Sequence, residues 1–234
     1  MSVETRNIKL LLTVLLFACL GTLALRHDTL AQPPRQSPAG DYPHKGVNVD
    51  PYLRLDDYVA DDLDDLGAGW VRLEFKWKDG GISTSDYQAF INRLKSRNIS
   101  ILGLVDNTTY PATQAEWGTT AFRDNFVRTV VEQVVRNFED DVDYWEIWNE
   151  EDFAGDTAMQ PADYAKLLGG DPNANPSSQP WARQGMYDAI KAEDPGATVL
   201  FGGLSNSWIG DGSAAEYLII FARSILPSCK TSGM

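Results

Sequence analysis

One stretch of the sequence combines a strand pattern with acidic side chains at its end. Residues 143–153 read DYWEIWNEEDF, with four bulky aromatic or β-branched residues within five positions. The stretch then becomes acidic, and a following Gly-Asp pair indicates a loop. A carboxylate is costly to bury unless it is paired or takes part in chemistry. An apolar strand that delivers Asn149 and Glu150 at its carboxyl end is therefore typical of an active site.

Two further charged residues belong to the same region of the predicted sheet. Glu146 lies on the same side of its strand as Glu150, one layer deeper. A buried carboxylate needs a cation, and Arg72, on the second predicted strand, is the natural partner. A purely structural ion pair is the competing interpretation for Arg72 and Glu146. For Glu150 the competing interpretation is an ordinary salt bridge at the end of a strand.

Other common catalytic chemistries lack their residues. The histidines are His27 and His44, and the cysteines are Cys19 and Cys229, so neither a Ser-His-Asp triad nor zinc spacing is present. The acids at 56–65 lack the loop glycine of a calcium site and indicate a solvated helix face. We therefore predict no metal and no cofactor. An unrelated β/α enzyme that holds a metal with acids remains a third possibility, without recognisable ligand spacing.

Composition limits the partners. The 234 residues are 43% hydrophobic and 23% charged, which is ordinary for a globular protein with one sizeable core. The formal net charge is -13, which argues against nucleic acid or an anionic membrane surface as a partner. The excess of acids is interpreted as an aid to solubility.

The N-terminus has the pattern of a secretory signal. Two cations precede an apolar run at 10–25, and a small-residue cleavage site ends at Ala31. We expect a signal peptide at 1–31, a Pro- and Ser-rich linker at 32–44, and a secreted or extracytoplasmic domain at 45–226 with no membrane contact after cleavage. An uncleaved N-terminal membrane anchor is the alternative, and a lipoprotein cysteine at Cys19 is a weaker one. Residues 227–234 form a polar tail.

Strand and helix patterns alternate through the domain. Strands are expected at 45–49, 70–77, 99–105, from 143 and at 197–203, with helices at 53–66, 85–97, 122–138, 161–168, 181–193 and 214–226. Five βα units predict a parallel sheet with right-handed crossovers.

The Trp148-Asn149-Glu150 sequence at a strand end resembles the acid/base strand of the retaining glycoside hydrolases of clan A, which are built on an eight-fold β/α barrel. Downstream residues fall in the order found in the β-xylosidase and iduronidase-like branch and its cellulase-like relatives: Phe153, 164–168, 189–191, Asp194-Pro195 and Gly202-Gly203. The resemblance covers roughly residues 45–210. Glu151 stands where the family usually has a proline.

This resemblance implies roles for individual residues. Glu150 would be the general acid/base, Asn149 would hydrogen-bond the sugar 2-hydroxyl, and Arg72 would brace the nucleophile. The substrate would be a β-linked oligosaccharide or polysaccharide.

Aromatic side chains near strand ends are candidates for stacking on sugar rings, although packing in the core or in loops is at least as common. They are Trp77, Tyr110, Trp117, Trp148 and Trp208. Asn206, just after the fifth strand, is a candidate substrate contact.

Five βα units correspond to the N-terminal five-eighths of a barrel, so the expected fold class is α/β, a partial TIM (β/α)8 barrel. The family's nucleophile ends the seventh strand, which this sequence lacks. Neither Glu74, expected in mid-strand, nor Glu151, adjacent to the donor, has suitable geometry. Two interpretations remain: a secreted glycoside hydrolase-like protein, or a non-catalytic carbohydrate-binding remnant or half-barrel. A half-barrel would need a partner chain at the open edge of the fifth strand.

Overall fold

The computed structural model describes residues 45–51, 55–76, 83–153, 158–205 and 214–225, all within the unit Pro33–Met234. The expected signal peptide, linker and tail lie outside these residues, as do Trp77, Asn206 and Trp208.

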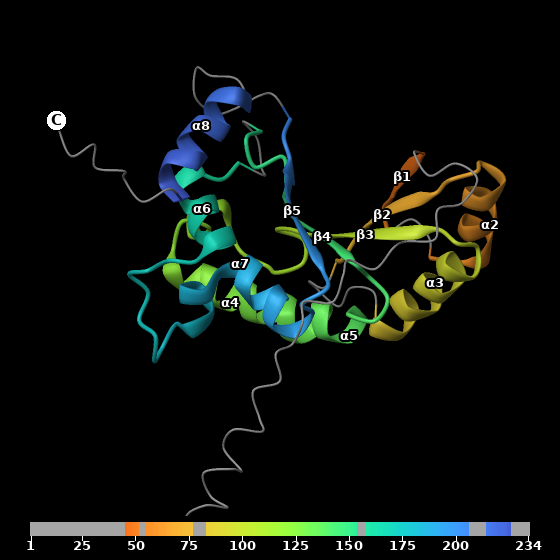
Figure 1. Cartoon of the computed structure of the whole chain (residues 1–234), viewed down its shortest axis with the longest axis horizontal. Coiled ribbons are helices and arrows are strands. Elements are labelled where there is room, and N and C mark those ends of the chain that lie inside the picture. Colours follow the sequence, from red (N-terminus) through yellow and green to blue (C-terminus); the bar gives the residue numbers. More distant parts are fainter. Residues whose placement is uncertain (1–44, 52–54, 77–82, 154–157, 206–213, 226–234) are drawn as a thin grey trace, which may run out of the picture. The chain divides into compact units, whose positions relative to one another are not determined.

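Strands and helices alternate along the described chain (Figure 1). The strands are β1 (Gly46–Val49), β2 (Trp70–Glu74), β3 (Ser100–Val105), β4 (Tyr144–Asn149) and β5 (Thr198–Gly203). The helices are α2 (Asp57–Asp65), α3 (Thr84–Ser96), the 3₁₀ helix η1 (Gln114–Glu116), α4 (Thr120–Val130), the π-helical turn η2 (Val131–Val135), α5 (Arg136–Phe138), α6 (Pro161–Gly169), α7 (Pro180–Glu193) and α8 (Ala214–Ile225). None of the described helices is both long enough and apolar enough to cross a membrane.

The sheet has the strand order of a β/α barrel. Its order is β1-β2-β3-β4-β5, and every pairing is parallel. Doubly wound sheets reverse their strand order at a switch point, whereas barrel strands follow the chain. The fold is therefore α/β, with five described strands in barrel order.

One face of the sheet packs against helices. Alternate β2 residues Val71 and Leu73, and then Phe75, are fully buried. The Phe75 ring lies 5.1 Å from the Phe138 ring and 5.4 Å from the Trp145 ring. In Figure 1, α3, α4, α5 and α7 run along this side of the strands. The hydrophobic core therefore lies between the sheet and its helices, and the opposite side chains of each strand are free for other uses.

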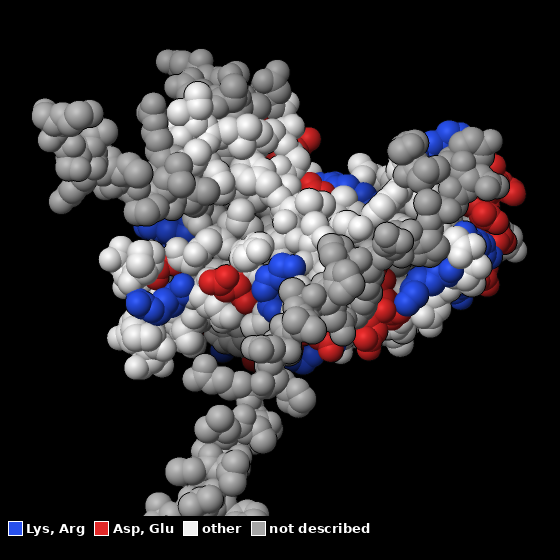
Figure 2. Space-filling model, viewed as in Figure 1, with Lys and Arg blue, Asp and Glu red and all other residues white. Residues whose placement is uncertain are grey.

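Side-chain caps begin three of the helices. The side chains of Asp56, Ser83 and Thr119 accept hydrogen bonds from backbone N–H groups in the first turns of α2, α3 and α4. The helix expected at 85–97 begins one residue earlier, at Thr84, because Ser83 caps its first turn. The acidic run is a solvated face of α2, as expected, and it forms ion pairs to α3 through Arg93–Asp57 and Arg97–Asp61. Figure 2 shows mixed charges there.

Two other predicted elements differ from the structure. The strand expected at 70–77 ends at Glu74, so Glu74 lies at the carboxyl end of β2 and not in mid-strand. The helix expected at 122–138 is interrupted by η2, whose wider turn keeps Val131, Val134 and Val135 buried.

Candidate active site

Charged side chains occupy the sheet face opposite the helices, toward the carboxyl ends of the strands. Arg72 and Glu74 alternate with the buried apolar residues of β2. Glu74 pairs in register with Leu104, which pairs with Glu146 on β4. In barrels of this strand order, chemistry occurs at these carboxyl ends.

Arg72 joins two strands at this face. Its Nε donates to Glu146 Oε2 at 2.7 Å, and its Nη2 donates to Glu146 Oε1 at 2.9 Å. Nη2 also donates to Asn149 Oδ1 at 2.8 Å. The backbone N–H of Gly203 on β5 donates to Glu146 Oε1 at 2.8 Å. The predicted ion pair between Arg72 and Glu146 is therefore present, and it also orients Asn149.

The electrostatics of this group favour the charged arginine. Burial lowers the pKa of Arg72, but the hydrogen bond and negative charge of Glu146 raise that pKa by more, so its net direction is upward. A bidentate guanidinium–carboxylate pair is also geometrically specific, because both hydrogen bonds lie in one plane. The pair holds the end of β4 in a fixed orientation.

The backbone at the end of β4 is strained. Trp148 has φ 77° and Glu150 has φ 50°, both in the left-handed region that non-glycine residues rarely adopt. Each such residue costs on the order of 1–3 kcal/mol, and such residues cluster at active sites. The Glu150 N–H donates to the Gly203 carbonyl at 2.9 Å, and the Glu150 carbonyl accepts from Phe153 N–H at 2.8 Å. Glu150, half-buried, is thus fixed by its backbone beside Asn149.

The position of Trp148 does not fit the sugar-stacking role expected from the sequence. Its side chain is 0% exposed, and its ring lies 4.8 Å from Trp117 and 5.6 Å from Phe126 of α4. The left-handed φ turns the side chain out of the strand alternation, which would have placed it beside Glu146. Trp117 is likewise buried, and Tyr110 packs against Phe122.

A second polar cluster follows β2 and β3, and sequence reasoning did not assign a role to it. The Thr108 hydroxyl lies 2.8 Å from Glu74 Oε1 and 2.7 Å from Asp106 Oδ1. Lys76 bridges Glu74 and Asp50 at 3.2 Å and 3.1 Å. Burial, followed by the charge of Glu74, raises the pKa of Asp106 to about 6. The sequence feature that could have indicated this cluster is the Asp106-Asn107-Thr108 loop, directly after an apolar strand.

Glu151 has a different environment from Glu150. Its side chain is fully buried, and neither carboxyl oxygen is hydrogen-bonded to another residue. Burial raises the pKa of Glu151 to about 8, and the negative charges of Asp152 and Glu146 add to this rise, against a lowering by its own backbone amide. Two consecutive glutamates therefore have different surroundings at the end of β4.

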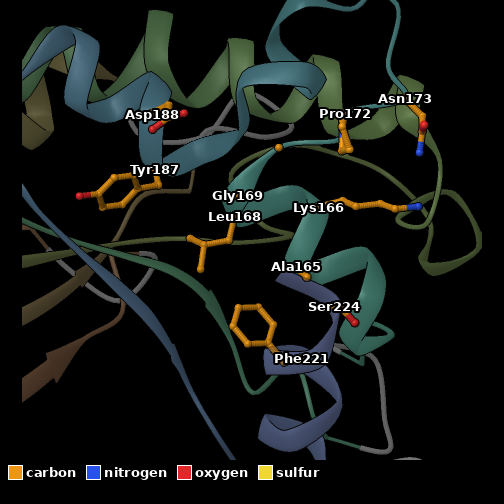
Figure 3. A pocket seen from close by; sticks show the side chains of 11 residues that line it. Ala165, Lys166, Leu168, Gly169, Pro172, Asn173, Tyr187, Asp188, Phe221 and Ser224 are labelled. Atoms are coloured by element: carbon orange, nitrogen blue, oxygen red, sulfur yellow. The ribbon is translucent and has the colours of Figure 1, made fainter. Parts of the chain in front are cut away.

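Neither a metal site nor the cavity in Figure 3 coincides with this face. Over the described ranges, no group of three or more His, Cys, Asp or Glu side chains is arranged to hold a metal ion. A cavity of about 820 Å³ lies among α6, α7 and α8, and Figure 3 shows Leu168 and Phe221 pointing into it. Neither Arg72, Glu146 nor Asn149 lines that cavity.

No protein-family model matches the sequence, and no curated protein sequence matches it. Among solved structures, the virulence factor SghA from Agrobacterium tumefaciens is similar at 15% identity and TM-score 0.44, over 61% of this chain and 35% of SghA. A β-glucosidase from Thermotoga maritima in complex with glucoimidazole is similar at 13% identity and TM-score 0.42, over 62% of this chain and 36% of the enzyme. The psychrophilic β-glucosidase BglU from Micrococcus antarcticus is similar at 17% identity and TM-score 0.38, over 49% of this chain and 28% of BglU. The matched part of this chain thus spans only about a third of the length of the first two.

Proposed function

We propose that the chain is a secreted glycoside hydrolase-like protein that acts on a β-linked oligosaccharide or polysaccharide. Glu150 is its general acid/base, and Asn149 binds the sugar 2-hydroxyl. The observation that carries this proposal is the Arg72 clamp, which fixes Glu146 and Asn149 at the carboxyl end of β4, directly before the strained residue Glu150. Trp77, Asn206 and Trp208 are further proposed substrate contacts. Arg72 is proposed to orient Asn149 toward the substrate.

The chemistry proposed for Glu150 is proton transfer to the leaving oxygen. Glycoside hydrolysis needs a second carboxyl group, roughly 5 Å away in retaining enzymes. Glu74 is not assigned this role, because its carboxylate is already engaged by the Thr108 hydroxyl at 2.8 Å and by Lys76 at 3.2 Å. We therefore assign the acid/base and leave the nucleophile unassigned.

Hydrolysis of aryl β-glycosides tests the assignment. We expect Glu150→Gln to lower kcat/KM at least 100-fold, in line with the loss of a general acid. The matched control, Asp62→Asn, removes an exposed acid of α2 and should leave the rate unchanged. Full activity in Glu150→Gln would contradict the proton-donor role.

The leaving group makes this test specific. A general acid assists poor leaving groups most, because good ones depart without a proton. Glu150→Ala should therefore lose much more activity on phenyl glycosides than on dinitrophenyl glycosides. An equal loss on both substrates would indicate a structural role for Glu150.

A second function is favoured by the edge of the sheet. β5 pairs only with β4 among the described strands, and Leu200, in register with Glu146, is 36% exposed. An unpaired strand edge beside exposed apolar side chains is typical of an association surface. The alternative is thus a non-catalytic carbohydrate-binding remnant or a half-barrel that needs a partner chain. Oligosaccharide binding without turnover, measured by calorimetry, would favour this alternative.

A further inference from the structure

Glu151 is a buried acid without the partners that such a group normally has. Its side chain is 0% exposed, and neither Oε1 nor Oε2 hydrogen-bonds to another residue. An ionised carboxylate in such a place would be very costly, because a buried charge requires a cation or several donors. A neutral carboxylic acid avoids most of that cost and gains a donor O–H.

The surroundings leave room for the acid and for little else. A Cβ at Gly202 would lie 2.3 Å from Glu151 Oε2 and 2.9 Å from the Trp148 carbonyl oxygen. Those two oxygens therefore face the same small space over the end of β5. A protonated Oε2 can donate to a carbonyl oxygen, whereas an ionised one would repel it.

The neighbouring hydroxyl groups have other partners. The Tyr164 hydroxyl of α6 donates to the Ile147 carbonyl at 2.6 Å and accepts from Gly202 N–H at 2.9 Å. The Tyr217 hydroxyl of α8 donates to the Met159 carbonyl at 3.0 Å. Neither tyrosine proton is therefore offered to Glu151.

The charged neighbours also favour the neutral acid. Asp152 and Glu146 both act on Glu151 with negative charge, and Glu150 adjoins it in the chain. β5 contributes glycine backbone at this point. Arg72 is engaged with Glu146 and Asn149 on the other face. The direction of the Glu151 pKa, upward to about 8, agrees with this arrangement.

We propose that Glu151 is a positioning residue: as a neutral carboxylic acid, it seats the loop that carries Glu150 against the end of β5. The proposed acid/base role of Glu150 is the function on which this inference rests. Glu151 directly follows the strained residue Glu150. Two hydrogen bonds anchor the chain at this point: Met159 N–H donates to the Glu151 carbonyl, and Ser205 N–H donates to Asp152 Oδ1. Loss of the proton would place an unpaired charge under the loop and release it from β5.

Protonation is tested by denaturant unfolding of the full chain from pH 5 to pH 9. The variants are Glu151→Gln and Glu151→Met, whose side chains are neutral and close in size to glutamate. If only one of them folds, that variant alone is sufficient for the comparison with the wild type. The folded-state pKa is raised, so the stabilisation is present at low pH and is lost as pH rises toward 8. The unfolding equilibrium constant of the wild type should rise about tenfold per pH unit relative to the variant over this window. Parallel curves would overturn the neutral-acid assignment.

Positioning is tested by hydrogen exchange of the peptide at 148–153. We expect faster exchange in the wild type than in the neutral variant at pH 9, and equal exchange at pH 6. Equal exchange at both pH values would overturn the positioning role. The normalised pH–rate profile should also extend to higher pH in Glu151→Gln, and an unshifted profile would count against positioning. If no form hydrolyses glycosides, the proposed function fails, while unfolding and exchange still decide the role of Glu151.

Discussion

Arg72 makes the interactions that fix the end of β4, so its removal has a specific consequence. Glu146 is 6% exposed, and Arg72 is the cation that satisfies its carboxylate. We expect Arg72→Met to destabilise the fold by about 3–5 kcal/mol, because a buried charge is left unpaired. The double variant Arg72→Met/Glu146→Met removes both charges and should recover most of this loss. Urea unfolding of the wild type, the two single variants and the double variant measures the coupling free energy between the two residues. Additive losses of stability would show that the two residues are not coupled.

The Asp106 carboxyl should make stability depend on pH in a different window from Glu151. Its pKa rises from 3.8 to about 6 in the folded protein. Protons are therefore held more tightly in the folded state, and the stabilisation present at low pH is lost as pH rises through 6. Relative to Asp106→Asn, the wild type should lose roughly 1.4 kcal/mol per pH unit between about pH 4 and 6. Thermal unfolding across this range tests this dependence, and a constant difference between the two proteins would contradict the raised pKa of Asp106.

At the scale of elements, the contact between β3 and β4 depends on the absence of one side chain. A Cβ at Gly103 would lie 2.7 Å from Trp145 Cζ3 and 3.1 Å from Phe75 Cε2. Gly103→Ala should destabilise the protein by about 1–3 kcal/mol, because these fully buried rings cannot move freely. Gly169→Ala, with no atom within 4 Å of its added Cβ, is the matched control and should be neutral or slightly stabilising. Equal melting temperatures for the two variants would mean that the rings rearrange.

The sequence was sufficient for the elements, and less so for the directions of their side chains. Periodicity and turn residues predicted five strands and the helices between them, because apolar patterning reflects burial directly. Trp148 shows the limit of that approach. Strand alternation placed its ring beside Glu146, but a left-handed φ turns it toward Trp117 and α4. Nothing local in the sequence indicates such a conformation, since it is imposed by tertiary packing.

The candidate site was predictable for a similar reason, and to a similar extent. Opposite charges on the same face of a parallel sheet can meet across an intervening strand, so the Arg72–Glu146 pair between β2 and β4 followed from the strand pattern. The cluster around Asp106 and Thr108 did not, because it depends on how two loops approach each other. The contrast between Glu150 and Glu151 depends on backbone geometry after the strand ends, which composition does not encode.

At the scale of the whole molecule, the outer edge of β5 should determine how the chain associates. Leu200 on the sheet is 36% exposed, and Ile219 on the following helix α8 is 51% exposed. An edge strand without a second partner presents backbone donors and acceptors to other chains, and β5 pairs with β4 alone among the described strands. We expect the purified chain to self-associate with rising concentration, although its net charge of -13 opposes this.

Sedimentation velocity over a hundredfold range of concentration, with charge-introducing variants, tests this expectation. Leu200→Lys and Ile219→Lys should each shift the distribution toward monomer, because a lysine on an exposed strand edge or helix face opposes pairing. Leu66→Lys is the matched control: Leu66 is 64% exposed but lies at the end of α2, next to the opposite end of the sheet. If all three variants associate alike, the β5 edge is not the surface of association. If the two edge variants alone become monomeric, a partner that completes the sheet is the occupant to seek, and glycoside hydrolysis should be measured again in its presence.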